Sequence, residues 1–281
     1  MSGPQSLQEL RDAVQTRPPW FADLDVAPTA DKKPDRAAWS ALDDAPDVVA
    51  VRVQGLDQAG LEYLASHHAA RLVAIDFFRC PRIADFSPLE DMANLRVVSS
   101  DWNQRAVRFW DVARTPALAS LGFAAFTQLH RLDDLAAGAS LVELDLGDII
   151  WPKSTVETLE PLAGLTGLRG LSIHIKRVDD GRLQPLGGLL GLEELYITSN
   201  LFTTEQFAWL RARLPESVVS NVLGPLSWLG GDAHPSPDVV LVGKGKPVLR
   251  TDTDAARIAQ HVQRFDEMVA AFRADPSRQP A

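Results

Sequence analysis

Hydrophobic positions recur through the middle of the chain as a triplet of the form apolar-x-x-apolar-x-apolar. Seven copies follow one another at intervals of 23 to 27 residues, and 20 of their 21 slots hold Leu, Val, Ile or Phe. The second and third members of each triplet alternate with other residues, which is the period of a strand with one buried face. The copies begin at Val48, Leu72, Leu95, Leu118, Leu141, Leu168 and Leu192.

A second apolar series precedes several triplets, with one apolar residue at every third position. Phe86, Leu89 and Met92 form this series before Leu95. A spacing of three residues suits a 3₁₀ or loosely helical segment with an inward apolar stripe. One strand and one return segment bury too little surface to fold alone, whereas stacked neighbours share a continuous core. The pattern therefore predicts about seven stacked strand-and-return units.

These units resemble the leucine-rich repeat family, whose motif L-x-x-L-x-L-x-x-N/C-x-L covers a strand and its return. The ninth motif position holds Cys80, Asn103 and Asn200 in three copies. In the family this side chain bonds to the backbone of the neighbouring turn, so the resemblance implies a structural ladder at these three residues. Leu56, Phe126, Ile149 and Lys176 occupy the position in the other copies and interrupt the ladder.

The resemblance covers residues 48 to 200 and implies an α/β leucine-rich repeat solenoid of the internalin-like or ribonuclease-inhibitor-like kind. In such a solenoid a parallel sheet lines the concave face of a curved horseshoe, and 3₁₀ or helical returns lie outside it. We expect three parts, which are an N-terminal cap at residues 1–46, the solenoid at 47–216 and a C-terminal cap at 217–281. Arg outnumbers Lys by 22 to 6 in an Ala-rich chain, which favours a bacterial source.

Each cap combines a helix with other structure. A short helix is predicted at residues 5–16, followed by irregular wrapping from Trp20 to Pro46. The C-terminal cap is predicted to contain a strand, a turn at residues 243–246, a second strand and an amphipathic helix from about Thr253 to Arg273. The longest interval between triplets adds residues around Trp151, which we interpret as a bulge with the indole packed over a widened turn.

Polar and aromatic residues lie between the apolar positions of each strand and project from the opposite side of the sheet. Carboxylates dominate the charges there, and they would attract a cationic partner, while the aromatics supply contact area. This composition predicts a concave face that binds a basic protein, although a merely solvated sheet is the alternative. The predicted contact residues are Asp76, Phe78, Asp101, Trp102, Glu143, Asp145, Asp148, His174, Glu194 and Tyr196.

Net charge and the single cysteine bear on the class of partner and on the cellular compartment. The 281 residues carry a formal net charge of −9, which argues against nucleic-acid binding because phosphates require a basic surface. A single cysteine cannot form an intramolecular disulfide, so we expect the cytoplasm. The first twenty residues include Glu9 and Asp12 and predict neither a secretory signal nor a membrane anchor, and no apolar run predicts a membrane span.

The sequence contains no established catalytic or metal-binding motif. His174 lies near acidic residues, but no established metal motif accompanies it. The run Val242 to Pro247 lacks phosphate-loop spacing and predicts a turn, and Cys80 is expected to be a buried structural thiol.

We therefore expect a non-enzymatic module that needs no cofactor and binds a protein, for example as an inhibitor or immunity protein. Two alternatives stay open at this point. The first is an enzyme or biosynthetic-pathway accessory with its site in the C-terminal segment. The second is a homo-oligomer formed through the terminal helix.

Overall fold

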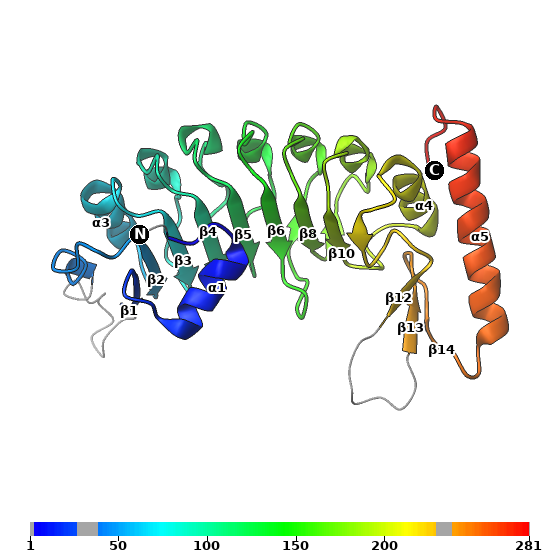
Figure 1. Ribbon diagram of the computed structural model, residues 1–281, viewed down its shortest axis with the longest axis horizontal. Coiled ribbons are helices and arrows are strands. Elements are labelled where there is room, and N and C mark those ends of the chain that lie inside the picture. The colour runs from blue at the N-terminus through cyan, green and yellow to red at the C-terminus, as the bar shows by residue number, and fades with distance from the viewer. Residues whose placement is uncertain (1–2, 27–38, 229–237, 281) are drawn as a thin grey trace.

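The computed structural model describes residues 3–26, 39–228 and 238–280 and has a mixed α/β fold. Its main element is a nine-stranded parallel sheet in which the strands follow chain order (Figure 1). From β2 onward, the connections between neighbouring strands pass over one side of this sheet. The strands are β1 (Phe21–Asp25), β2 (Ala50–Gln54), β3 (Ala74–Phe78), β4 (Val97–Asp101), β5 (Ser120–Ala124), β6 (Glu143–Gly147), β8 (Gly170–His174), β10 (Glu194–Ile197) and β11 (Val219–Ser220).

The seven predicted triplets occupy seven consecutive strands in one register. Val51 pairs with Ile75, which in turn pairs with Val98, and the same row continues without a shift to Leu195 in β10. These side chains are buried in the main hydrophobic core, on the side of the sheet that the connections cover. The sequence pattern is thus confirmed as the pattern of the sheet.

The connections stack on one another in the same order as the strands. They contain helix α3 (Gln58–His68), the 3₁₀ turns η1 (Ser87–Asp91), η2 (Val112–Arg114), η3 (Asp133–Leu135), η4 (Glu160–Leu162) and η5 (Gln184–Gly188), and helix α4 (Thr204–Arg213). The series is in contact from α3 through η1 to η2, and again from η3 through η4 and η5 to α4. Leu89, Leu162 and Leu186 come from the three-residue apolar series and are fully buried. The prediction of 3₁₀ returns is confirmed at these positions.

Strand β1 corrects the prediction of irregular wrapping after Trp20. It pairs in parallel with β2, and Ala22 and Leu24 pack against the main core while Asp23 and Asp25 alternate with them. The sequence gives no signal for this strand because Phe21, Ala22 and Leu24 do not have the triplet spacing that marks the other units. Residues 27–38 of the predicted wrapping lie outside the described residues.

The first helix, α1 (Leu7–Thr16), lies across the sheet on the side opposite the connections (Figure 1). We call this side the outer face. The Ser6 hydroxyl caps the helix by accepting a hydrogen bond from the Glu9 amide at 3.1 Å. Leu7, Leu10 and Ala13 are buried in a second apolar cluster together with the first residues of four strands, Phe21, Ala50, Ala74 and Val97. The small side chains of Ala50 and Ala74 leave room for the helix.

The C-terminal part contains a small antiparallel sheet and a long helix. The sheet consists of β12 (Leu226–Trp228), β13 (Asp238–Leu241) and β14 (Val248–Arg250), so the predicted turn at residues 243–246 is confirmed. Helix α5 (Ala255–Ala274) packs along α4, with Phe265 and Phe272 buried in the main core. The apolar stripe of the terminal helix is therefore used within the chain. Across the described ranges, every helix is too short or too polar to cross a membrane.

The longest interval between triplets forms a projecting loop rather than a packed bulge. Trp151 is 65% exposed, so the prediction that its indole packs over a widened turn is wrong. The Asp148 carboxylate accepts hydrogen bonds from the amides of Ile150 and Trp151 at 2.7 and 3.1 Å, and the Lys153 ammonium lies 5.7 Å from the centre of the Trp151 ring. Beyond the loop, β7 (Thr155–Val156) pairs with β9 (Arg177–Val178) in a separate two-stranded sheet.

Three residues other than glycine adopt left-handed backbone angles directly after successive strands. Their φ angles are +51° at Arg79, +63° at Trp102 and +50° at Ala125, and Gly55 holds the same place after β2. A side chain at such an angle costs about 1–2 kcal/mol relative to the right-handed region, a cost that glycine avoids.

We expect Ala125→Gly to stabilise the protein by up to about 1 kcal/mol, because glycine removes the strain at this turn. The matched change Ala124→Gly lies one residue earlier, inside β5, and should instead cost about 0.5–1 kcal/mol. Urea unfolding of the two variants measures the difference. Equal destabilisation by both would contradict the assignment of strain to Ala125.

Candidate functional site

The outer face is built from side chains that alternate with the buried triplets. Its middle row runs from Arg52 through Asp76 to Asp145 and Tyr196, because these residues occupy equivalent positions on neighbouring strands. Phe78 and Asp101 form the next row toward the carboxyl ends of the strands. The structure thus brings together the predicted contact residues of β3 to β10 on one side of the sheet.

Helix α1 occupies part of this face. Arg11 forms a 2.9 Å ion pair with Asp145, and the Leu7 amide donates a 2.9 Å hydrogen bond to the Glu143 carboxylate. Glu143 also lines a shallow hollow of about 200 Å³ with Glu194, which is exposed at the amino end of β10. Two of the predicted partner contacts are therefore already occupied within the chain, Glu143 by a helix amide and Asp145 by a cationic side chain.

Arginine side chains cover the aromatic residues at the carboxyl ends of β3 and β4. The guanidinium carbon of Arg52 lies 4.0 Å from the centre of the Phe78 ring, and that of Arg79 lies 5.0 Å from the same ring. Arg79 also lies 5.2 Å from the Trp102 ring, which remains 44% exposed. Contacts of this kind fix the guanidinium groups over the ring faces. Trp102 is thus the most accessible predicted aromatic on this side.

An acidic group lies beside Trp102, and we call Asp101, Asp148 and His174 the carboxyl-end cluster. Burial raises the pKa of Asp101, and the nearby charge of Asp148 raises it further, while Arg79 opposes both effects. Burial lowers the pKa of His174, against the opposite influence of Asp145 and Asp148. His174 is therefore neutral at pH 7, so it does not offset the two acidic residues of the cluster.

Asp76 offers a test of the electrostatics of this face. Burial raises the pKa of its carboxyl above the ordinary value of 3.8, although Arg52, at 3.6 Å, and a hydrogen bond from Ser99 lower it. The folded state therefore binds the proton more tightly than the unfolded chain, and its stability falls as the pH rises above 3.8 through the raised pKa.

We expect Asp76→Asn to be more stable than the parent chain at pH 7, because the neutral amide avoids the cost of burying a charge. The advantage should shrink as the pH is lowered toward 3.8, where the aspartate is protonated. Urea unfolding at several pH values measures this difference. An advantage that grows toward acid pH would contradict the expected sign.

The residues of the predicted ladder fall into two groups. The buried Cys80 thiol lies 3.3 Å from the Val53 carbonyl, and burial raises its pKa to about 12, so it is protonated at neutral pH. The buried Asn103 amide donates to the carbonyl groups of Cys80 and Ile83 at 3.2 and 2.9 Å. Both side chains bond to the backbone of the preceding unit, Cys80 at the strand β2 and Asn103 at the turn that follows β3.

Asn200 does not continue this arrangement. Its side chain is exposed, because the chain after β10 leads into the N-terminus of α4 instead of another turn of the same shape. Ser154 makes a comparable contact that sequence reasoning missed, since its buried hydroxyl donates to the Phe126 carbonyl at 2.6 Å. The inserted loop shifts Ser154 away from the ninth motif position, so the motif gives no signal for it.

The loop that follows Asp148 adds an apolar surface next to the cluster. Ile149 and Ile150 are 75% and 72% exposed, in addition to the exposed Trp151. The interval length marked this insertion in the sequence, but nothing in the spacing indicated that its apolar side chains point into solvent. Among the described residues, no group of three His, Cys, Asp or Glu side chains is arranged to hold a metal ion.

Comparisons with known proteins do not assign this chain to a family. The chain matches no protein-family model, and a search of the curated proteins gives no significant match. The arrangement that bears on function is therefore the combination of two carboxylates, an exposed indole and an apolar loop at one end of the strands. Such a surface can attract a cation and bury apolar area against it.

Proposed function

We propose that the chain is a leucine-rich repeat solenoid that acts as a non-enzymatic module and binds a basic protein through the outer face of its sheet. The binding surface consists of Trp102, the carboxyl-end cluster and the loop tip at residues 149–151. The role suits an inhibitor or immunity protein that neutralises a cationic enzyme or toxin. The lone buried thiol of Cys80 accords with a cytoplasmic location.

The exposed loop carries this proposal. Three successive large apolar residues, each at least 65% exposed, are unusual on a surface that needs only to be solvated. They follow directly on Asp148, whose charge acts on Asp101. An apolar anchor beside paired negative charges matches a partner that presents an apolar patch near Lys or Arg.

The proposal for the fold draws support from the regular alternation of strands and returns. Seven strands share one register, their returns follow one another in chain order, and Cys80 and Asn103 bond to the backbone of the preceding unit. The departures lie at the inserted loop and at Asn200. They affect single turns and leave the strand core continuous, as stacked repeats tolerate.

Charge reversal tests the binding face. We expect the double variant Asp101→Lys with Asp148→Lys to weaken capture of the partner at least about 100-fold, because like charges across an interface cost several kcal/mol. Immobilised protein would be used to capture partners from the native host, with quantitative mass spectrometry as the readout. A captured basic protein should then be purified and its dissociation constant measured.

A matched control keeps the net charge of the variant but places the change elsewhere. Glu62→Lys with Asp91→Lys alters exposed residues of α3 and η1, on the side of the sheet that carries the connections. This control should bind as the parent chain does. Equal binding by the parent and both double variants, or equal loss in both, would refute the proposed face.

A further inference from the structure

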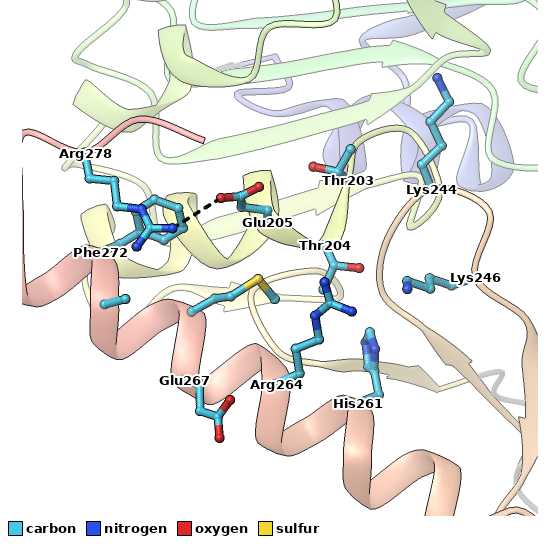
Figure 2. Close-up of a pocket in the computed structure, with 12 residues that line it drawn as sticks. Thr203, Thr204, Glu205, Lys244, Lys246, His261, Arg264, Glu267, Phe272 and Arg278 are labelled. Atoms are coloured by element: carbon cyan, nitrogen blue, oxygen red, sulfur yellow. Dashed lines mark ion pairs between the residues drawn. The ribbon is translucent and has the colours of Figure 1, made fainter. Parts of the chain in front are cut away.

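A cleft of about 660 Å³ lies at the C-terminal end of the molecule, far along the chain from the proposed protein-binding residues (Figure 2). Its walls are the N-terminus of α4, the turn between β13 and β14, and one side of α5. The sequence motif at residues 242–247 contributes only a turn to the fold, yet it places Lys244 and Lys246 at this cleft.

Positive charge dominates the cleft although the chain as a whole is acidic. Four cationic side chains line it, namely Lys244, Lys246, Arg264 and Arg278, against the carboxylates of Glu205 and Glu267. Arg278 pairs with Glu205 at 3.8 Å. Within the described ranges, the other three cations form no ion pair.

Figure 2 shows how the cations are directed. The guanidinium of Arg264 and the ammonium of Lys246 point toward the space in front of Thr204, whereas Lys244 extends away from it. Cations held close together without counter-ions repel one another, so an anion between them would relieve the repulsion.

The backbone of α4 adds to the positive charge at the cleft. Thr203 and Gln206 form a reciprocal capping box, which satisfies the amides of these two residues. The amides of Thr204 and Glu205 begin the helix and have no acceptor within it, and both residues line the cleft, which places the positive end of the helix at its wall. Helix N-termini with free amides favour negatively charged groups.

The turn is attached firmly to this helix end. Its Lys244 amide donates to the Phe202 carbonyl at 2.7 Å, and the Thr204 hydroxyl donates to the Val242 carbonyl at 2.9 Å. Gly243 has a φ of +132°, and a side chain there would collide with Thr204. Lys246 is therefore presented by a turn whose position is fixed before any ligand arrives.

His261 supplies an independent indication of a ligand. Its side chain lines the cleft from α5 and is only 7% exposed. Burial lowers the pKa of the ring, whereas the carbonyl groups of Pro225 and Val242 act on it as hydrogen-bond acceptors that raise its pKa, although within the described part of the chain the buried Nε2 has no partner at hydrogen-bond distance. A buried polar atom without a partner is costly, and a hydrogen bond to a ligand would remove that cost.

From these observations we propose that the cleft binds a small soluble phosphate ester, with Lys246, Arg264, the N-terminus of α4 and His261 around the phosphate group. This site is separate from the protein-binding face. It gives the C-terminal part a function beyond covering the end of the hydrophobic core.

Pyrophosphate is a suitable probe because it presents phosphate groups, the part of the ester that the cleft would hold, without any other recognition element. Titration of the full chain with pyrophosphate, measured by calorimetry, should show saturable binding at physiological salt. Lys246→Gln with Arg264→Gln should weaken it at least about tenfold, since hydrogen bonds to charged groups are the strong ones. The control Lys176→Gln with Arg105→Gln makes the same change in net charge at exposed residues elsewhere and should bind as the parent does.

Histidine NMR provides a second readout that does not depend on affinity. The ring resonances of His261 should shift on titration with pyrophosphate, while those of His174 on the outer face should not. The proposal is overturned if pyrophosphate fails to bind, if the control variant loses as much affinity as the test variant, or if succinate binds as tightly. Binding to vesicles that contain phosphatidic acid, in the absence of pyrophosphate binding, would also overturn it.

Discussion

Phe77→Ala is expected to lower the free energy of unfolding by about 3–5 kcal/mol. The Phe77 side chain is fully buried between the sheet and its connections, and its ring meets that of Phe86 edge-on with 5.5 Å between the centroids. Truncation removes this contact and leaves a cavity that neighbouring units cannot fill without shifting. Chemical denaturation of the variant measures the loss.

The adjacent residue provides the control, because consecutive side chains of a strand point to opposite faces. Phe78→Ala makes the same chemical change on the outer face, where the ring is half-buried beneath Arg52. It should cost no more than about 1 kcal/mol, the scale of a partly exposed cation–π contact. Similar losses at both positions would contradict the register on which the core and the outer face depend.

Leu7→Asp combined with Leu10→Asp is expected to release α1 from the sheet while the rest of the chain stays folded. Both leucines are 1% exposed, and an unpaired carboxylate cannot be buried in their place without a cost of several kcal/mol. A free helix of ten residues is marginal in water. Amide hydrogen exchange over residues 7–16 should therefore accelerate at least about 100-fold.

The same variant also tests how α1 affects the proposed interface. Release of the helix frees the carboxylates of Glu143 and Asp145, so capture of a basic partner should become stronger. Gln8→Asp adds one carboxylate to the exposed side of α1 and should leave both exchange and binding unchanged. Unchanged exchange in the double variant would show that the two leucines do not hold the helix in place.

Sequence periodicity predicted most of the sheet because the buried apolar residues of the strands recur along the chain. Each strand contributes two inward apolar residues, and their constant spacing reveals the stack even where Ser100 replaces one of them. Strand β1 lacks this spacing and was missed. Ala22 and Leu24 alternate with Asp23 and Asp25, but one short stretch without the triplet spacing does not stand out from the chain around it.

The candidate site was predicted less completely, because its properties depend on contacts between distant residues. Alternation along the strands placed Asp101 and Tyr196 on one face. It could not indicate that Arg11 would pair with Asp145 from a segment 134 residues away. Nor could it show that Trp151 stays exposed, since an apolar residue in a long interval suits a packed turn equally well.

The order of the strands has a consequence for how the chain is made. Each strand pairs with one that is synthesised shortly before it, so the sheet can grow unit by unit as the polypeptide emerges. Helix α1 is made first, yet its hydrogen bond to Glu143 joins residues 136 positions apart. Leu7 and Leu10 can pack on the first four strands as soon as these have formed, but the helix cannot make this hydrogen bond until β6 has left the ribosome.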